Sequence, residues 1–349
     1  MHIAWFGKAM PDSGNITYSR ETTNRLCNIG LKVSFLKLII SNDLEPFDNS
    51  DYKADIHIVP LDADVELITK MLRELKPDIV HISLAASRLD FDLPRICKKL
   101  GIPMIGIFHQ PFNYQIAQEN YICYQIYAST LCEYDYIIAI SESQKQLLQQ
   151  IGVDNAKINV IPYGIDTDFY CPPVSKNNES LIFLYQGRIA KEKNLEALLE
   201  AWIDCDMPLT SELLLMGTGD LLEDLSAKYK ANNIKWLGHI KDKKHQLEIL
   251  QNTDFFISPS LADAMSLSLL EAMSCGIYCI ATDVGAHREL LEGFGTLLSP
   301  MTAKQELCSL LPTLDKNKTS KTREIYTISD SVEKLLQLYK RCNINCSSP

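Results

Sequence analysis

The feature that most constrains the fold of this chain is a repeated alternation of short apolar runs with amphipathic segments. Parallel strands need long crossover connections, usually helices, so the alternation predicts βαβ units and a mainly parallel sheet. In the first half of the chain the expected strands are residues 2–6, 33–38, 56–59, 79–82, 104–108, 136–140 and 158–161. The expected helices are residues 63–75, 89–100, 115–133 and 143–151. We therefore predict a doubly wound α/β domain.

The alternation stops near residue 170 and starts again after residue 180. The intervening stretch contains Pro172-Pro173 and a polar run at 175–180, which is typical of a linker. After it we expect strands at 181–185, 212–216, 254–258 and 277–281, helices at 194–202, 220–231, 266–274 and 329–342, and a polar loop at 315–323. We predict two Rossmann-like, doubly wound α/β domains that face each other across a cleft, residues 1–168 and 181–325, with a linker at 169–180 and a closing helix and tail at 326–349.

The charge balance bears on the partners of the chain. Lys and Arg total 34 and Asp and Glu total 44, which gives a net charge of −10. A protein that binds duplex nucleic acid normally presents a basic surface, so we expect no nucleic-acid partner. The acidic balance also argues against strong attraction of the whole surface to anionic membranes.

The cysteines and the apolar runs indicate the compartment. The 11 cysteines show neither a CxxC pair nor a paired metal knuckle, so we expect reduced, mostly buried thiols. The N-terminus lacks a long apolar segment, and no apolar run approaches the ~20 residues that a membrane span needs. We expect a cytoplasmic protein, and a peripheral position at the inner face of a membrane stays open.

The tract 258–289 carries the densest group of candidate binding residues. A predicted strand ends at residue 258, a polar loop carries Asp263, and a predicted helix that begins near Ser266 carries Glu271. A helix N-terminus offers free backbone N–H groups and a partial positive charge, which suits a phosphate. Glu271 would then accept hydrogen bonds from a ribose diol while the phosphates lie at the start of the helix.

A second candidate region follows the first strand of the second domain. Arg188 and Lys193 lie in the loop QGRIAKEKN before a predicted helix, and two cations beside a helix N-terminus can hold a diphosphate. Gly217 and Gly219 follow the next strand in the same way. A short glycine-rich turn lets the backbone approach a ligand closely.

These residues and their spacing resemble the glycosyltransferases of the GT-B fold, specifically the retaining glycosyltransferase family 4 (group 1). The resemblance rests on Gly187-Arg188 with Lys193-Asn194, and on the run from Leu270 to Gly276, LEAMSCG, with Asp263 eight residues before Glu271. The tract IPYGID at 161–166 resembles the domain junction of that family, and Ser141-Glu142-Ser143 resembles the tract before it. The match covers about residues 1–300.

The resemblance implies a role for each residue of the second domain, which would hold the nucleotide-sugar. Arg188 and Lys193 would bind the donor diphosphate and stabilise it as it leaves. Asp263 would contact hydroxyls of the transferred sugar, and Glu271 would bind the ribose. The backbone of Ala264, Met265 and Ser266 would face the sugar and the phosphate.

The first domain would take the acceptor side. The resemblance places His109 beside the donor sugar and Gly14 in the first strand–helix loop, facing the donor or the acceptor. Aromatic candidates for the acceptor pocket occur between residues 110 and 127 and are equally compatible with the core: Phe112, Tyr114, Tyr121, Tyr124 and Tyr127. The implied reaction moves a hexose, with retention, from a UDP- or GDP-sugar to a carbohydrate or lipid-linked acceptor such as a polysaccharide or glycolipid precursor.

Three departures from the family pattern keep a second hypothesis open. Asp263 stands where the family has Glu, Ala264-Met265-Ser266 stands where it has Gly-Phe-Gly, and Tyr163 stands where it usually has Asn. The altered loop motivates a nucleotide-sugar-binding protein without catalysis. Plain structural alternatives are a solvated loop for the two cations, a helix-capping role for Asp263, a structural role for His109, and turn glycines at 14, 217 and 219.

We expect no metal cofactor. Asp-x-Asp pairs, which can bind a divalent ion and a diphosphate in glycosyltransferases of another fold, occur at 62/64, 90/92, 166/168 and 204/206. Four such pairs in an acidic chain are expected by chance. Arg188, Lys193 and a helix N-terminus can neutralise the diphosphate leaving group in place of a metal ion. A dinucleotide-dependent oxidoreductase is disfavoured because residues 7–14 lack the G-x-G-x-x-G spacing.

Overall fold

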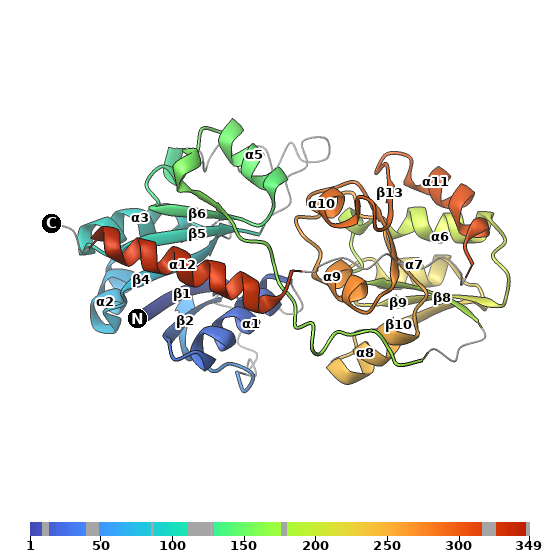
Figure 1. The fold of residues 1–349 in the computed structure, drawn as a ribbon, viewed down its shortest axis with the longest axis horizontal. Coiled ribbons are helices and arrows are strands. Elements are labelled where there is room, and N and C mark those ends of the chain that lie inside the picture. Colours follow the sequence, from blue (N-terminus) through green and yellow to red (C-terminus); the bar gives the residue numbers. More distant parts are fainter. Residues whose placement is uncertain are drawn as a thin grey trace. The chain divides into compact units, whose positions relative to one another are not determined.

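The computed structural model describes residues 1–8, 14–39, 49–84, 87–109, 127, 129–175, 180–315 and 326–346. The chain forms two compact units (Figure 1). One consists of Met1–Tyr163 together with Ile328–Pro349, and the other of Gly164–Thr327. The last helix of the chain therefore belongs to the N-terminal unit. The segment boundaries expected at 168, 180 and 325 stay predictions, because compactness does not separate a linker from the unit on which it packs.

The N-terminal unit is built on a seven-stranded, all-parallel sheet of order β3-β2-β1-β4-β5-β6-β7. Its strands are β1 His2–Lys8, β2 Lys32–Ile39, β3 Asp55–Pro60, β4 Ile79–Leu84, β5 Met104–Phe108, β6 Tyr136–Ala139 and β7 Ile158–Val160. Its described helices are α1 Gly14–Asn28, α2 Val65–Leu75, α3 Leu89–Leu100, α5 Glu142–Gln150, η1 Asn155–Lys157 and α12 Ile328–Cys346. All six residues of β4 are buried, as expected for a parallel strand covered on both faces.

The C-terminal unit repeats this architecture with a six-stranded parallel sheet of order β10-β9-β8-β11-β12-β13. Its strands are β8 Leu181–Gln186, β9 Ser211–Met216, β10 Ile234–Gly238, β11 Phe255–Ser258, β12 Tyr278–Thr282 and β13 Thr296–Leu298. Its described helices are η2 Lys191–Lys193, α6 Leu195–Asp204, α7 Leu222–Lys228, α8 Lys243–Asn252, α9 Leu267–Ser274, α10 His287–Leu291, α11 Ala303–Leu310 and η3 Leu311–Thr313.

The order of strands reverses at one point in each sheet. In the C-terminal unit the chain runs outward from β8 through β9 to β10 and then returns to β11 on the other side of β8. Ligands of open α/β sheets bind at such a switch point, beyond the carboxyl ends of the strands. The loops that follow β8 and β11 carry the candidate residues, so the topology places both of them at this point.

The structure confirms the predicted fold class of two Rossmann-like α/β units. The predicted strands correspond to observed ones within a few residues. The described elements that we did not predict are the short 3-10 helices η1, η2 and η3 together with α1, α8, α10, α11, β10 and β13. Most of the expected helix at 115–133 and of the loop at 315–323 lies outside the described residues, as do the aromatic candidates at 112, 114, 121 and 124. The remaining candidate, Tyr127, is buried.

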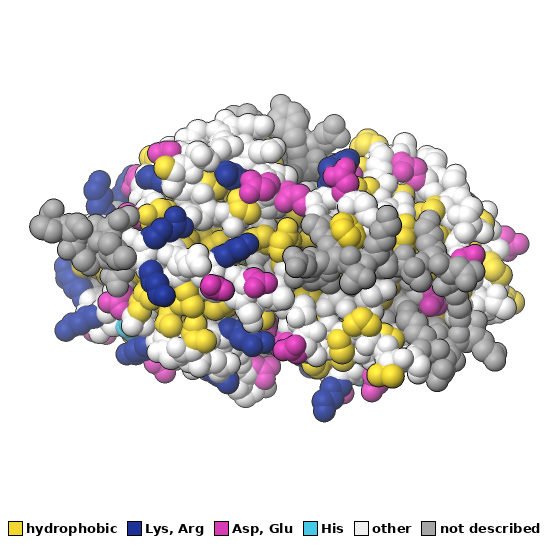
Figure 2. Space-filling view, in the orientation of Figure 1, with side chains coloured by type: hydrophobic (Ala, Val, Ile, Leu, Met, Phe, Trp, Pro, Cys, Tyr) yellow, Lys and Arg dark blue, Asp and Glu magenta, His cyan; other side chains and the backbone are white. Residues whose placement is uncertain are grey.

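The surface of the N-terminal unit carries charges of both signs. Figure 2 shows Lys and Arg side chains interspersed with Asp and Glu around α12. The exposed residues of that helix include Glu333, Lys334, Lys340 and Arg341. Among the described helices, none is both long enough and apolar enough to cross a membrane. The nine cysteines whose side chains the structure describes are free, and four of them are buried, so burial is less general than we expected.

Candidate functional site

The glycines after β8 and β9 let two loops pack closely against each other. A Cβ on Gly217 would lie 1.9 Å from the Gly187 carbonyl oxygen, and a Cβ on Gly219 would lie 2.3 Å from the Ile189 carbonyl oxygen. The Ile189 N–H donates to the Thr218 carbonyl at 2.7 Å and fixes this packing. The two glycines therefore have a steric role in shaping the loop that carries Arg188. Their contact with a ligand stays a prediction.

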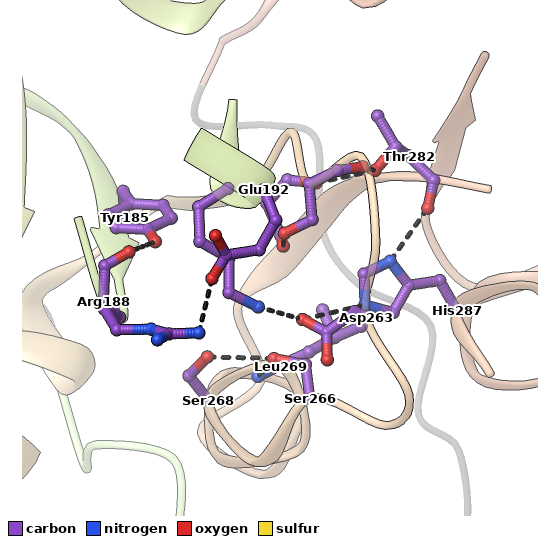
Figure 3. Close-up of polar contacts among 12 residues, drawn as sticks. Tyr185, Arg188, Glu192, Asp263, Ser266, Ser268, Leu269, Thr282 and His287 are labelled. Atoms are coloured by element: carbon purple, nitrogen blue, oxygen red, sulfur yellow. Dashed lines mark hydrogen bonds and ion pairs between the residues drawn. The ribbon is translucent and has the colours of Figure 1, made fainter. Parts of the chain in front are cut away.

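Arg188 lies in the loop after β8, with its guanidinium at the surface. The Tyr185 hydroxyl donates to the Arg188 carbonyl at 2.7 Å and holds the backbone in place. The Arg188 side chain is 63% exposed, and its Nη2 lies 2.5 Å from Glu192 Oε1 (Figure 3). This ion pair keeps the guanidinium beside η2.

Lys193 and Asp263 form the contact that joins the two candidate regions. Lys193 ends η2, and its Nζ lies 2.7 Å from Asp263 Oδ2, with both side chains mostly buried at 19% and 14% exposure. The Glu192 carbonyl accepts the Leu261 N–H at 2.8 Å and ties the loop before α9 to η2. The structure thus brings together two residues that are 70 positions apart in the sequence.

The charge of Asp263 is stabilised by its neighbours. Burial raises the pKa of its carboxyl group, but the charge of Lys193 and the hydrogen bond from Lys193 outweigh this effect and leave the pKa below its usual value. His287 Nε2 lies 4.0 Å from Asp263 Oδ2, and His287 Nδ1 donates to the Thr282 carbonyl at 2.8 Å. Sequence reasoning assigned no role to His287. Its place at the start of α10 offered no pattern that distinguishes it from an ordinary helix residue.

The N-terminus of α9 lies directly after the Asp263 loop. Ser266 caps the helix and accepts the Leu269 N–H at 3.3 Å. The Ala264 carbonyl accepts the Ala286 N–H at 2.9 Å, and the Met265 side chain is buried. Contacts within the C-terminal unit therefore fix the backbone of this loop. The contacts of residues 264–266 with the sugar and the phosphate stay predictions.

Glu271, the fifth residue of α9, is held by a residue that we did not predict. Gln186 at the end of β8 donates through Nε2 to Glu271 Oε2 at 2.8 Å, and Glu271 is 8% exposed. The other amide atom, Gln186 Oε1, is buried and makes no hydrogen bond within the described part of the chain. Gln186 connects the β8 loop with α9, and only the folded sheet brings the two side chains together.

His109 and Gly14 belong to the N-terminal unit. His109 follows β5, is buried, and uses both ring nitrogens, with Nδ1 2.5 Å from the Tyr163 hydroxyl and Nε2 3.0 Å from Ser83 Oγ. Burial lowers its pKa to about 3, so the ring is neutral at physiological pH. Gly14 is the first residue of α1 and not a residue of the preceding loop as we expected.

Metal-ligating side chains do not gather in the part of the chain that the structure describes. No group of three or more His, Cys, Asp or Glu residues in that part could hold an ion. Of the Asp-x-Asp pairs, Asp64 caps α2 and Asp90 accepts the Ser87 hydroxyl at 2.9 Å. The independence of the chain from metal stays a prediction.

Both units of the chain match models of known protein families. Residues 57–169 match the model of Glycosyltransferase Family 4, and residues 180–314 match the model of Glycosyl transferases group 1. The chain belongs to the group 1 glycosyltransferases. The two matched ranges fall almost entirely in different units, so both halves of this glycosyltransferase carry the family pattern.

Relatives of this glycosyltransferase include enzymes named for lipid-linked acceptors. It is 27% identical over 304 residues to the UDP-Gal:alpha-D-GlcNAc-diphosphoundecaprenol alpha-1,3-galactosyltransferase of Escherichia coli, with 77% of each chain covered. It is 22% identical over 296 residues to a phosphatidylinositol N-acetylglucosaminyltransferase chain from Arabidopsis thaliana, covering 81% of this chain and 66% of that protein. It therefore spans just under two thirds of the plant relative's length.

A solved structure shares the fold over almost the whole chain. The glycosyltransferase superposes on Anabaena Alr3699/HepE in complex with UDP and glucose with a TM-score of 0.79 and 14% identity, covering 97% of this chain and 99% of that one. At this identity the likeness shows the fold alone. It agrees with the GT-B resemblance that the sequence motifs indicated.

Proposed function

We propose that this glycosyltransferase moves a hexose from a UDP- or GDP-sugar to a carbohydrate or lipid-linked acceptor, with retention of the anomeric configuration. The observation that carries the proposal is the contact of 2.7 Å between Lys193 Nζ and Asp263 Oδ2, directly before the N-terminus of α9. A cation for a diphosphate and a carboxylate for sugar hydroxyls thus lie together beside a helix terminus that favours anions.

The two cations would change partners when the donor binds. Arg188 pairs with Glu192, and Lys193 pairs with Asp263. A diphosphate carries two negative charges and offers several oxygens, so it competes with a single carboxylate for each cation. Arg188 and Lys193 would then stabilise the charge that grows on the leaving diphosphate, which is where preorganised electrostatics contribute most to catalysis. Asp263, released from Lys193, would accept hydrogen bonds from sugar hydroxyls.

Glu271 would bind the ribose of the donor. It lies about one and a half helical turns beyond Ser266, the residue that caps α9, so a nucleoside whose phosphates lie at the helix start would have its ribose near this carboxylate. The Gln186 amide holds Glu271 at 2.8 Å and keeps one carboxylate oxygen in a fixed direction. We infer that Gln186 orients Glu271 and does not itself react.

UDP-hexoses are the first donors to test. The E. coli relative is named for UDP-galactose, and the Anabaena structure contains UDP and glucose. Retention is inferred from the likeness to family 4. We also infer that no metal is required, because Arg188, Lys193 and the α9 terminus can neutralise the diphosphate.

A lipid-linked acceptor is supported by the relatives' names, which refer to a diphosphoundecaprenol-linked sugar and to phosphatidylinositol. Peripheral contact with the cytoplasmic face of a membrane would bring the enzyme to such an acceptor. Exposed cations of the N-terminal unit that would favour it lie on α3 and α12: Arg95, Lys98, Lys99, Lys334, Lys340 and Arg341. Co-sedimentation with anionic vesicles, but not with neutral ones, is the result expected if this contact forms.

The alternative is a nucleotide-sugar-binding protein without catalysis. The observation that favours it is the loop Ala264-Met265-Ser266, which stands where the family has Gly-Phe-Gly, with Met265 buried and the Ala264 carbonyl bonded to Ala286. Such a loop has less freedom to approach a sugar than one that contains glycines.

A panel of donors tests both functions. Purified protein is mixed with UDP-glucose, UDP-galactose, UDP-N-acetylglucosamine and GDP-mannose, and both the melting temperature and the release of free nucleotide are measured. A matching donor at about 100 times its Kd stabilises the fold by about 2.7 kcal/mol. The variant Lys193→Met should lose this effect, while Lys191→Met, an exposed residue of the same short helix, should keep it.

The outcomes separate the two functions. A rise in melting temperature together with nucleotide release supports the transferase, and NMR of the transferred product then gives the anomeric configuration. Stabilisation by a donor without release or transfer favours the binding protein. If none of the four donors stabilises the chain, the proposed donor site is wrong.

A further inference from the structure

We propose that His287 is a positioning residue for Asp263, and that the two side chains together take up one proton from solvent when the donor diphosphate draws Lys193 away from Asp263. The inference rests on the proposed function, because it needs a diphosphate at Lys193. It concerns a residue that the family pattern does not assign, and its basis is the geometry around the His287 ring.

The protonation of the ring in the ligand-free protein follows from its contacts. His287 is completely buried, and its Nδ1 lies 2.8 Å from the Thr282 carbonyl oxygen. A carbonyl oxygen only accepts hydrogen bonds, so Nδ1 carries a proton. Burial lowers the pKa of the ring, and in the neutral form Nε2 therefore presents a lone pair.

That lone pair faces a carboxylate. Nε2 is 4.0 Å from Asp263 Oδ2 and makes no hydrogen bond within the described residues. Figure 3 shows Asp263 lying toward the His287 ring, whose other nitrogen points to Thr282. Two acceptors that face each other in a buried place are unfavourable, because neither can satisfy the other. The arrangement persists in the free protein because Lys193 holds the same carboxylate oxygen at 2.7 Å.

The donor would remove this support. Once Lys193 turns to a diphosphate, the buried Asp263 carboxylate has lost its nearest cation and has an acceptor nitrogen as neighbour. A proton on Nε2 turns the repulsion into an attraction, and a shift of Asp263 toward the ring from the present 4.0 Å then makes a charge-assisted hydrogen bond. The proton comes from solvent, Nε2 gains it, no covalent bond of the donor changes, and the bond to Thr282 is kept. Asp263 is then held in one orientation towards the sugar.

The other charges around His287 also favour the uptake of a proton when the donor binds. The charged groups that act on the ring are Asp263, Lys193 and Asp283: Asp263 and Asp283 raise its pKa, while Lys193 lowers it. Asp283 is paired with Arg288, and the proposed donor contacts do not involve this pair. Movement of Lys193 therefore removes a charge that disfavours the proton and leaves the two carboxylates, so the pKa of the pair rises on donor binding.

The experiment is calorimetric titration of the full chain with UDP-glucose, and with the other donors of the panel, in PIPES and in Tris. These buffers differ in ionisation enthalpy, so the difference in measured heat gives the number of protons exchanged. A nucleotide-sugar is used because its diphosphate, unlike the terminal phosphate of free UDP, has no ionisation near neutral pH. We expect uptake that approaches one proton per donor, and a Kd that rises roughly tenfold per pH unit across the window of uptake.

Two variants of the pair and one control complete the test. His287→Asn keeps a donor for the Thr282 carbonyl and removes the titrating nitrogen, so the donor should bind without proton uptake and with a flat pH profile. Asp263→Asn should also abolish the uptake, and it serves if His287→Asn fails to fold. His245→Asn replaces an exposed histidine of the same unit and should behave as the wild type does.

The outcomes distinguish this inference from the function on which it rests. Donor binding without proton uptake by the wild type, or uptake that persists unchanged in His287→Asn, overturns the proton-sharing pair and leaves the donor site intact. Absence of binding by every donor overturns the donor site and the pair together. A merely structural role of His287 would change stability and affinity but not the number of protons.

Discussion

Gly285 offers a sharp test of how the Asp263 loop is held. Its φ of +52° lies in the left-handed region, and a Cβ built on it would lie 2.0 Å from the Asp263 carbonyl oxygen and 2.6 Å from that of Ala264. For Gly285→Ala, the Asp263 oxygen would have to retreat by roughly 1.4 Å before ordinary contact at 3.4 Å is reached. Backbone atoms give way less easily than a flexible side chain does, so the loop that carries Asp263 should shift.

The size of the effect follows from two contributions. An alanine in the left-handed region costs about 1–2 kcal/mol by itself. Gly293→Ala is a matched control for this cost, because Gly293 has φ +82° and a Cβ there would meet nothing within 4 Å. A misplacement of about 1 Å near reacting groups can cost about 10²-fold in rate. We therefore expect both variants to lose stability, and Gly285→Ala alone to lose about 10²-fold in kcat/KM for the donor.

The assay combines urea denaturation with the release of nucleotide from the donor that the panel identifies. Urea denaturation measures the loss of unfolding free energy that both alanine variants share. Nucleotide release reports whether the Asp263 loop has shifted. Equal kcat/KM values for Gly285→Ala and Gly293→Ala would refute the reasoning, since they would show that the contact of Gly285 with the Asp263 carbonyl does not set the geometry of the site.

Further predictions concern the cations, the ribose, pH and metal. Arg188→Ala should lower kcat about 10²–10³-fold yet change the free energy of unfolding by less than about 0.5 kcal/mol, because the side chain is 63% exposed; denaturation and steady-state kinetics measure both. Gln186→Leu should raise the donor KM about fivefold with little change in kcat, as lost orientation of Glu271 is worth about 1 kcal/mol; an unchanged KM argues against an orienting role. The pKa of His109, about 3, is below that of an unfolded histidine, so stability is full above pH 6.5 and falls as pH drops toward 3. In His109→Asn the free energy of unfolding should fall less steeply between pH 5.5 and 4, by about 1.4 kcal/mol per pH unit, as urea denaturation at several pH values would show. EDTA should leave activity within about twofold, and strict dependence on added Mg²⁺ or Mn²⁺ would contradict metal independence.

The fold was predictable because its central strands are continuous apolar runs. All four residues of β11 are buried, and such strands stand out in the sequence. The strands that we missed, β10 and β13, lie at the edges of the C-terminal sheet. β10 is partly exposed and contains Lys235, so its apolar content is too low to separate it from a loop.

The residues of the site were predictable where a local pattern carries the chemistry. Arg188, Lys193, Asp263 and Glu271 stand in short stretches whose spacing resembles a known family, and in the structure Lys193 contacts Asp263. The residues that complete the site have no such pattern, because their roles arise from contacts between segments far apart in the sequence. Gln186 is 85 positions from Glu271.

His109 illustrates the same limit in the N-terminal unit. The sequence placed it at the end of a strand, which is correct, but its partner Tyr163 is 54 positions away. In the sequence Tyr163 stands out only as a departure from the family pattern. In the folded unit the hydroxyl of this tyrosine meets the His109 ring, so the departure supplies a hydrogen bond to the histidine that the family likeness assigns to the donor sugar.

The most direct test of the account is a crystal structure with the donor bound. The account predicts that the diphosphate lies at the N-terminus of α9, within hydrogen-bond distance of Lys193 Nζ and the Arg188 guanidinium, and that the ribose hydroxyls meet Glu271. A diphosphate bound elsewhere, with Lys193 still on Asp263 and Arg188 still on Glu192, would contradict it.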